Sequence, residues 1–280
     1  MIKFLLIGIW LIFSSHFAFA EERLVTIGGA VTEIVFALGK QSEIVATDIT
    51  SYYPEATQSI PKIGYMRTLS AEGLLSTKPT LVIAEAGAGP RNVLDQIKKA
   101  GVTVIQLDEN YSALQVAKNI RLIGRVLKAS SAESLAKEYE DAWQLTQKKL
   151  AKMEAKPRIL FVLDNTGKNP QAAGDDTAAN AIINLMQGRN VMAGKYKGYR
   201  PLTAESVIAA SPDFIITTKE GVEASGGLES FLEKSGLGLT PAGQSKRVIY
   251  QDTLKLLGFT PRLPRMIDEL SSATHPLSQQ

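Results

Sequence analysis

One stretch of sequence decides the fold: Gly64-Tyr65-Met66-Arg67-Thr68-Leu69-Ser70-Ala71-Glu72-Gly73-Leu74-Leu75, which continues through Lys78-Pro79 into the apolar run 81–84. The same order of residue types returns in the second half of the chain as Gly198-Tyr199-Arg200-Pro201-Leu202-Thr203-Ala204-Glu205-Ser206-Val207-Ile208, ahead of Ser211-Pro212-Asp213 and the apolar run 214–217. The second copy is one residue shorter between its Tyr and its Arg. Two copies so far apart are typical of two similar lobes rather than of a solenoid.

Each copy predicts the start of a short helix. Ser70 and Thr203 are good N-caps, and Glu72 and Glu205 fall in the first turn, where the helix dipole favours a negative charge. Each helix ends before a proline, and an apolar run typical of a buried strand follows. Each lobe is therefore expected to place a Gly-Tyr turn before a short helix whose exposed start carries a Glu.

Residues 1–20 have the pattern of a signal peptide. Lys3 gives the positive start, residues 4–13 are apolar, and Ala18-Phe19-Ala20 is a small-x-small cleavage site. The alternative, a membrane anchor, needs a longer apolar run. We expect cleavage after Ala20 and export to the periplasm. The chain has no Cys, which excludes disulfides, thiolate metal sites and a lipid attached through an N-terminal Cys.

Charge and histidine content exclude further classes. The chain has 280 residues and a net charge of +3 without a basic block, so nucleic acid is not an expected partner. Of the two histidines, His16 lies in the signal peptide and His275 in a Ser-, Pro- and Gln-rich tail that we expect to fray. A metal site built from several imidazoles is therefore excluded.

Residues 21–129 are predicted to form the first lobe. Apolar runs at 24–27, 43–46, 81–84 and 102–107 alternate with helical patterns, which is typical of a mainly parallel sheet covered on both faces. Gly28-Gly29-Ala30 joins the first strand to the first helix. Because it lacks the G-x-G-x-x-G spacing of a dinucleotide loop, we interpret it as a tight strand-to-helix turn.

A long helix predicted over 130–155 follows the first lobe. Ser130-Ser131-Ala132-Glu133 has the pattern of a capping box, and no Gly or Pro interrupts the sequence up to about Glu154. Such a helix spans roughly 35 Å, which is long for crossing one sheet. We interpret it as a spine between the lobes, the alternative being a surface helix within one domain.

Residues 156–280 are predicted to form the second lobe, with strands at 158–163, 214–218 and 248–251 and a last helix ending near Leu270. The predicted fold class is α/β: two Rossmann-like lobes with mainly parallel sheets, joined by one long helix, with a ligand cleft between them. No nucleophile elbow, Cys, core His or metal-ligand spacing is present, so we do not expect an enzyme. A hydrolase that uses only carboxylates is the remote alternative.

Several motifs resemble the haem-binding periplasmic proteins of ABC importers, and the likeness covers nearly the whole chain after residue 20. They are Gly28-Gly29-Ala30-Val31-Thr32-Glu33-Ile34, the 64–73 stretch, Ala172-Ala173-Gly174, Leu239-Thr240-Pro241-Ala242-Gly243-Gln244 and Leu257-Gly258-Phe259-Thr260-Pro261-Arg262. The resemblance implies haem held between two lobes and delivered to a membrane permease dimer with its ATPase, with an outer-membrane haem receptor upstream. We expect a monomer. A binding protein for a ferric siderophore or cobalamin is the alternative within the same class.

The resemblance implies that Tyr65 is the axial ligand of haem iron and that Arg67 hydrogen-bonds its oxygen. A phenolate oxygen suits ferric iron, and a neighbouring cation favours the deprotonated phenol. The alternative is a structural Tyr beside a solvated Arg. Some relatives add a histidine from the second lobe, where this chain has Asn165. The iron is then five-coordinate, or Tyr199 or Met66 supplies the sixth position; Met66 is otherwise a packing residue against the porphyrin, and Tyr199 stacks on it or binds a carboxylate.

The propionates of haem need cationic partners. The candidates are Lys168, Lys195, Lys197 and Arg200 in the second lobe and Arg91 in the first. In related importers a Glu at the tip of each lobe docks on permease arginines, and Glu72 and Glu205 match these positions. The alternative is that both carboxylates only complement helix dipoles. Since the predicted spine contains no Gly or Pro, we expect small motions of the lobes rather than wide closure.

Overall fold

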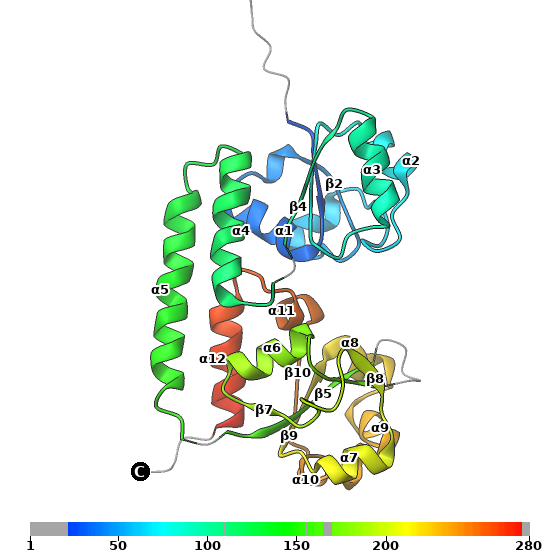
Figure 1. Cartoon of the computed structure of the whole chain (residues 1–280), viewed down its shortest axis with the longest axis vertical. Coiled ribbons are helices and arrows are strands. Elements are labelled where there is room, and N and C mark those ends of the chain that lie inside the picture. The colour runs from blue at the N-terminus through cyan, green and yellow to red at the C-terminus, as the bar shows by residue number, and fades with distance from the viewer. Residues whose placement is uncertain (1–21, 109, 155, 165–169, 276–280) are drawn as a thin grey trace, which may run out of the picture.

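The computed structural model describes residues 22–108, 110–154, 156–164 and 170–275. Figure 1 shows two α/β lobes, one above the other, and the long helix α5 along one flank, beside α4 in the upper part and α12 in the lower part. The predicted α/β fold with two lobes is confirmed. Among the described residues, no helix combines the length and the apolar character needed to cross a bilayer.

The first lobe contains a parallel sheet with the strand order β2-β1-β3-β4. Its elements are β1 (Leu24–Ile27), α1 (Gly29–Ala37), β2 (Ile44–Thr47), α2 (Ala71–Ser76), β3 (Leu81–Ala84), α3 (Arg91–Lys99), β4 (Thr103–Gln106) and α4 (Ala113–Val126), with 3-10 turns at Gln41–Glu43 and Glu55–Ser59. The two central strands, β1 and β3, are buried along their whole length. Burial on both faces explains their uninterrupted apolar sequences.

The second lobe contains a mixed sheet with the order β10-β9-β5-β6-β8, in which β7 also pairs with β5. Its strands are β5 (Arg158–Leu163), β6 (Gln171–Ala173), β7 (Arg189–Asn190), β8 (Tyr199–Pro201), β9 (Phe214–Thr218) and β10 (Val248–Gln251). Its helices are α6 (Ala178–Leu185), α7 (Ala204–Ala210), α8 (Lys219–Ala224), α9 (Leu228–Leu232), α10 (Pro241–Gln244), α11 (Thr253–Leu257) and α12 (Leu263–Thr274), with a 3-10 segment at Lys234–Leu239. The strands β5, β9 and β10 are parallel, whereas β6 and β8 are antiparallel to their neighbours.

The connecting helix α5 runs from Ala132 to Leu150, which is shorter than the sequence suggested. The predicted capping box is wrong, because the side chain of Ser131 makes no cap bond and its hydroxyl donates to the carbonyl of Leu38 at 3.3 Å. Glu133, expected to close the box, pairs instead with Arg121 of α4 at 2.8 Å. The helix is also not a lone spine, since α4 and α12 pack along it (Figure 1).

The C-terminal end of the described chain is more ordered than expected. The helix α12 continues to Thr274. His275 is 5% exposed, and its Nδ1 lies 3.1 Å from both the carbonyl of Ser271 and the hydroxyl of Thr274. The predicted fraying of His275 is therefore wrong, because the backbone N–H of this residue still bonds the last turn of α12 at 2.8 Å.

Candidate functional site

The loops after the strands define one edge of each sheet. Because β1 to β4 are parallel, the loops that follow them lie at the same edge, and these loops carry Gly28, Asp48, Glu85 and Tyr111. The strands β5, β9 and β10 likewise end together. In open α/β sheets, ligands bind outside the carboxyl ends of the strands. The residues in the loops at these two sheet edges are therefore the candidates for a ligand site.

Tyr65 stands on a turn that two neighbouring loops hold in place. Gly64, at φ +98°, allows the turn, and its carbonyl accepts the N–H of Ile49 from the loop after β2 at 2.9 Å. The carbonyl of Met66 accepts the N–H of Gly89 from the loop after β3 at 2.8 Å. The Tyr65 side chain remains 42% exposed. An exposed aromatic ring on a doubly anchored turn is suited to contact a ligand rather than to fill a core.

Arg67 is exposed, and its charge acts on groups in both lobes. Its guanidinium opposes the rise in the pKa of Glu85 in the first lobe and the rise in the pKa of Tyr199 in the second. Its Nη2 atom lies 3.8 Å from the position that a Cβ on Gly87 would take. Within the described residues no hydrogen bond joins Arg67 to Tyr65, so that bond stays a prediction for the loaded protein.

Tyr199 occupies a different environment from Tyr65. It begins strand β8 and packs against the core, where the backbone of Ala179, at the start of α6, opposes the rise in its pKa. Burial raises the pKa of Tyr199 to about 12, with Tyr111 adding to the rise. A neutral phenol is a poor ligand for ferric iron, so this environment disfavours Tyr199 as a sixth ligand.

Met66 points into the first lobe. It is 8% exposed within the core cluster beside Leu69 and Ala88, and its sulfur lies 3.9 Å from the hydroxyl of Thr50. This burial favours packing over coordination. Its predicted contact with the ligand stays a prediction.

The predicted partners of the propionates differ in their existing contacts with other side chains. Arg91 and Arg200 are exposed, and so is Lys195, whose Nζ lies 3.9 Å from the sulfur of Met192. Lys197 forms a surface ion pair with Asp176 at 2.9 Å. Asn165 and Lys168 lie outside the described residues.

The predicted docking residues Glu72 and Glu205 are both exposed in the first turns of α2 and α7. The predicted N-caps are confirmed: Ser70 accepts the N–H of Gly73 at 3.3 Å, and Thr203 accepts that of Ser206 at 3.2 Å. Figure 1 shows α2 and α7 on the flank opposite α5, one in each lobe. A partner that spans both lobes would find one carboxylate on each.

A buried polar network lies beneath the edge of the first sheet. The carboxylate of Asp48 is fully buried and accepts the N–H of Gly28 at 2.8 Å, the hydroxyl of Ser51 at 2.8 Å and the N–H of Thr50 at 2.9 Å. Glu85 accepts the N–H of Ala30 at 2.9 Å. The network fixes the Gly28 turn, which confirms a tight strand-to-helix turn.

Glu85 is the member of this network with an unusual charge state. Burial raises the pKa of Glu85 to about 7 and the Asp48 carboxylate adds to the rise, whereas the N–H of Ala30 and the guanidinium of Arg67 oppose it. A carboxyl group that titrates near neutral pH therefore lies beside the candidate site.

The sequence analysis did not single out Glu85, Asp48 or Tyr111. Their positional signal is simple, because each follows a predicted strand of a parallel sheet and so lies at the ligand-facing edge. Tyr111 is 39% exposed, and its ring centroid lies 5.4 Å from that of Phe259.

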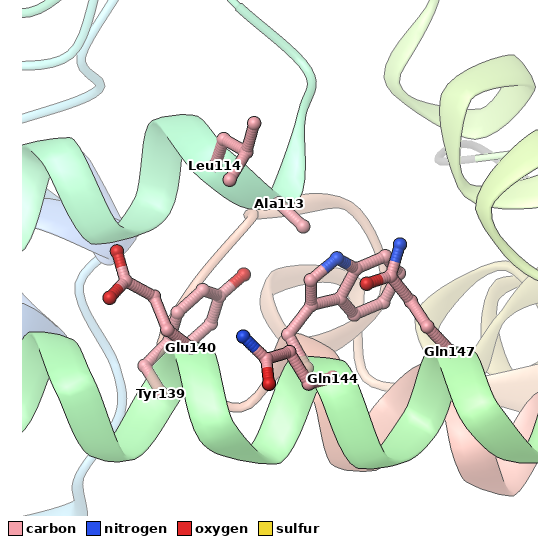
Figure 2. A pocket seen from close by; sticks show the side chains of 7 residues that line it. Ala113, Leu114, Tyr139, Glu140, Gln144 and Gln147 are labelled. Atoms are coloured by element: carbon pink, nitrogen blue, oxygen red, sulfur yellow. The ribbon is translucent and has the colours of Figure 1, made fainter.

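A separate hollow of about 320 Å³ lies between α4 and α5 (Figure 2). Ala113 and Leu114 line it from α4, and Tyr139, Glu140, Trp143, Gln144 and Gln147 line it from α5. None of the predicted ligand residues lines this hollow, so it is distinct from the candidate site. Among the described residues no group of three or more His, Cys, Asp or Glu side chains is placed to hold a metal ion.

Two lobes, a helical layer that joins them and an exposed Tyr at the sheet edge define a ligand-capture protein. The chain belongs to the periplasmic binding protein family, whose model matches residues 24–253.

Two solved structures of haem-binding proteins are similar to this chain in both fold and sequence. The chain is 36% identical to the periplasmic haem-binding protein RhuT from Roseiflexus sp. RS-1 in its apo form, with a TM-score of 0.87, covering 91% of this chain and 98% of that one. It is 40% identical to the periplasmic haem-binding protein BhuT in complex with two haems, with a TM-score of 0.85 and the same coverage.

Curated relatives are more distant in sequence. An uncharacterised ABC transporter substrate-binding lipoprotein, YvrC of Bacillus subtilis (strain 168), is 28% identical over 91% of this chain and 80% of its own length. A vitamin B12-binding protein of Yersinia pestis (strain Pestoides F) is 22% identical over 71% of this chain and 70% of its own length. RhuT and BhuT are haem-binding proteins, YvrC is a substrate-binding lipoprotein, and the Yersinia relative binds vitamin B12.

Proposed function

We propose that this protein captures haem between its lobes and delivers it to an ABC permease dimer with its ATPase, after an outer-membrane receptor has supplied the haem. Tyr65 is the axial ligand of the ferric iron. The observation that carries the proposal is the exposure of Tyr65 on a doubly anchored turn at the sheet edge, two residues before Arg67. We infer that the protein acts as a periplasmic monomer, after cleavage following Ala20, and has no enzymatic activity.

The chemistry of the site suits ferric haem. The exposed phenol of Tyr65 supplies a hard oxygen ligand, and Arg67, two residues on, is the proposed hydrogen-bond donor to that oxygen. Because the side chain of Tyr199 packs against the core, whereas that of Tyr65 is exposed, we infer that the iron is five-coordinate. The exposed cations Arg91 and Arg200 are the partners proposed for the propionates, together with Lys168. Asn165, in the same loop as Lys168, replaces the second-lobe ligand of some relatives.

Titration of the purified protein with haemin tests the proposal. Binding is expected to produce the absorption spectrum of a five-coordinate, high-spin ferric haem with a Tyr ligand. A ferric siderophore or cobalamin is expected not to compete. Tight binding of cobalamin without a haem spectrum would instead favour the alternative ligand.

Docking on the permease is proposed to use one carboxylate from each lobe, Glu72 and Glu205. Substitution of both by Lys is expected to abolish haem uptake in cells that depend on this protein, while the haemin titration stays unchanged. Substitution of Glu223 and Glu138, which are exposed outside α2 and α7, is the control for the change in net charge. Normal uptake by the Glu72→Lys/Glu205→Lys variant would remove the docking role.

A further inference from the structure

Two stretches that carry the family resemblance meet between the lobes. Glu33 lies on α1 of the first lobe, and Arg262 precedes α12. The Nε of Arg262 donates to the two carboxylate oxygens of Glu33 at 2.9 and 3.1 Å, and its Nη2 donates to Oε2 at 2.8 Å. Glu33 is 5% exposed. Bidentate charge-assisted bonds of this kind fix direction as well as distance.

Two adjacent aromatic residues extend this contact. The guanidinium of Arg262 lies over the ring of Tyr53, 3.8 Å from its centroid. The hydroxyl of Tyr52 accepts the N–H of Leu254, in the first turn of α11, at 2.7 Å. Since α11 directly follows β10 and packs against α6, this bond ties the first lobe to the second.

Leu254 also explains why the first helix begins with glycine. A Cβ on Gly29 would lie 2.5 Å from Cδ1 of Leu254 and 2.8 Å from the carbonyl oxygen of Thr50. A larger residue at position 29 would therefore force the side chain of Leu254 and the backbone at Thr50 to shift. The Gly28-Gly29 turn therefore allows a close approach of the two lobes, in addition to the turn itself.

The loop 48–53 connects this contact to the candidate site. Its tyrosines bind the second-lobe segment, and the N–H of Ile49, in the same loop, donates to the carbonyl of Gly64 beside Tyr65. Asp48 anchors the loop from below through its bonds to Gly28 and Ser51. A displacement of the second-lobe segment would thus be transmitted to the turn that carries Tyr65.

We propose that the loop 48–53 and the Glu33–Arg262 pair form an interlobe strut that sets the distance between Tyr65 and the second lobe. Glu33 and Arg262 are positioning residues, because they act on the ligand through the spacing of the lobes. The consequence for haem rests on the proposed function, whereas the spacing itself is a property of the ligand-free protein.

Spin labels can measure this spacing directly. The chain has no Cys, so Lys98→Cys on α3 and Ala209→Cys on α7 give one exposed label in each lobe. In the haem-free protein, Arg262→Met is expected to broaden the distribution of interlabel distances, and Arg262→Lys, which keeps one bond to Glu33, is expected to restore it in part. Arg262→Met is also expected to weaken haem binding about tenfold, as for other residues that orient a ligand, with the spectrum unchanged.

Arg121→Met is the control, because it removes bidentate Arg–carboxylate bonds to Glu140 and to Glu133 within the helical layer, away from the contact between the lobes. It is expected to leave the distance distribution unchanged. If Arg262→Met does not fold, Tyr52→Phe decides, since it removes the hydroxyl that accepts the N–H of Leu254 and contacts Asp252 at the start of α11, and keeps the ring. An unchanged distribution in Tyr52→Phe and in folded Arg262→Met overturns the strut. Broadened distances together with no haemin binding by the wild type would overturn the proposed function and leave the strut intact.

Discussion

The two copies of the Gly-Tyr motif share a sequence order but not a structure. In the first copy, Tyr65 stands on an exposed turn beside charged groups. In the second, Tyr199 begins strand β8, which pairs with β6, and its side chain packs against the core. The helices that follow are alike, since both begin at a hydroxyl N-cap and carry a Glu in the first turn.

The repeat therefore preserves the exposed helix of each lobe but not the environment of the tyrosine that precedes it. The matched helices α2 and α7 present similar carboxylates to the outside, whereas the tyrosines beside them have separate roles. One extra residue, Met66, accounts for part of the divergence. It enters the core of the first lobe and leaves Tyr65 on the opposite side of the chain.

The sharpest test of this asymmetry compares the two phenols. Tyr65→Phe is expected to weaken haem binding at least about 100-fold, because it removes the axial ligand, whereas Tyr199→Phe is expected to change it only slightly. Absorption titration with haemin measures both, and loss of the Tyr-ligated spectrum should occur only in Tyr65→Phe. Equal losses would mean that the two copies act as a pair.

Titration of Glu85, in the first lobe, is expected to make the stability of the protein depend on pH. Its pKa is about 7 in the folded protein and lies near 4.5 in the unfolded chain, so the folded state holds its proton over a wider range. The stability that this proton provides is complete below pH 4.5 and is lost as pH rises through 7. Glu85→Gln keeps the acceptor for Ala30 and is expected to gain on the order of 2 kcal/mol relative to the wild type at pH 8. Urea denaturation at pH 5 and pH 8 measures this, and an unchanged pH dependence would contradict it.

The two arginines of the repeat give a smaller contrast. Arg67→Met is expected to weaken haem binding about tenfold, because it removes the proposed hydrogen-bond donor to the oxygen of the axial ligand. Arg200→Met removes the matching charge from the second copy and is expected to have a weaker effect. Titration of both variants with haemin separates the two.

The caps are expected to give the smallest difference. Ser70→Ala and Thr203→Ala should each destabilise the protein by about 1 kcal/mol. The effect should be larger for Thr203, because Ser206 completes a reciprocal capping box there. The midpoints of urea unfolding measure both changes. A larger loss for Ser70→Ala would show that α2, and not α7, depends more on its cap.

Local signals in the sequence predicted the strands of the first sheet and the starts of α2 and α7, but not the strands β6, β7 and β8, which make the second sheet mixed rather than mainly parallel. Ser70 and Thr203 are caps for reasons contained within four residues, and β1 and β3 are apolar because both of their faces are covered. The capping box predicted over Ser130 to Glu133 did not form, because the helix begins one residue later, with Ser131 as its N-cap, and Glu133 pairs with Arg121.

The candidate site was harder to predict from the sequence than the strands and helix caps were. Tyr65 could be found from its motif, but the environment of Tyr199 depends on α6, and the Glu33–Arg262 pair joins residues from opposite ends of the chain. Contacts at such separation leave no local pattern. Glu85 could have been found from its place after a strand, although its raised pKa follows from burial that only the folded chain reveals.

The helical layer has a consequence for how the protein melts. One continuous apolar core runs from Leu24 and Ile120 in the first lobe, through Trp143, to Ile159 and Leu270. Unfolding of either lobe would expose apolar side chains of α5 that belong to the same core as the other lobe. Calorimetry should therefore record a single heat-absorption peak instead of two, and an isolated half of the chain should not hold its shape.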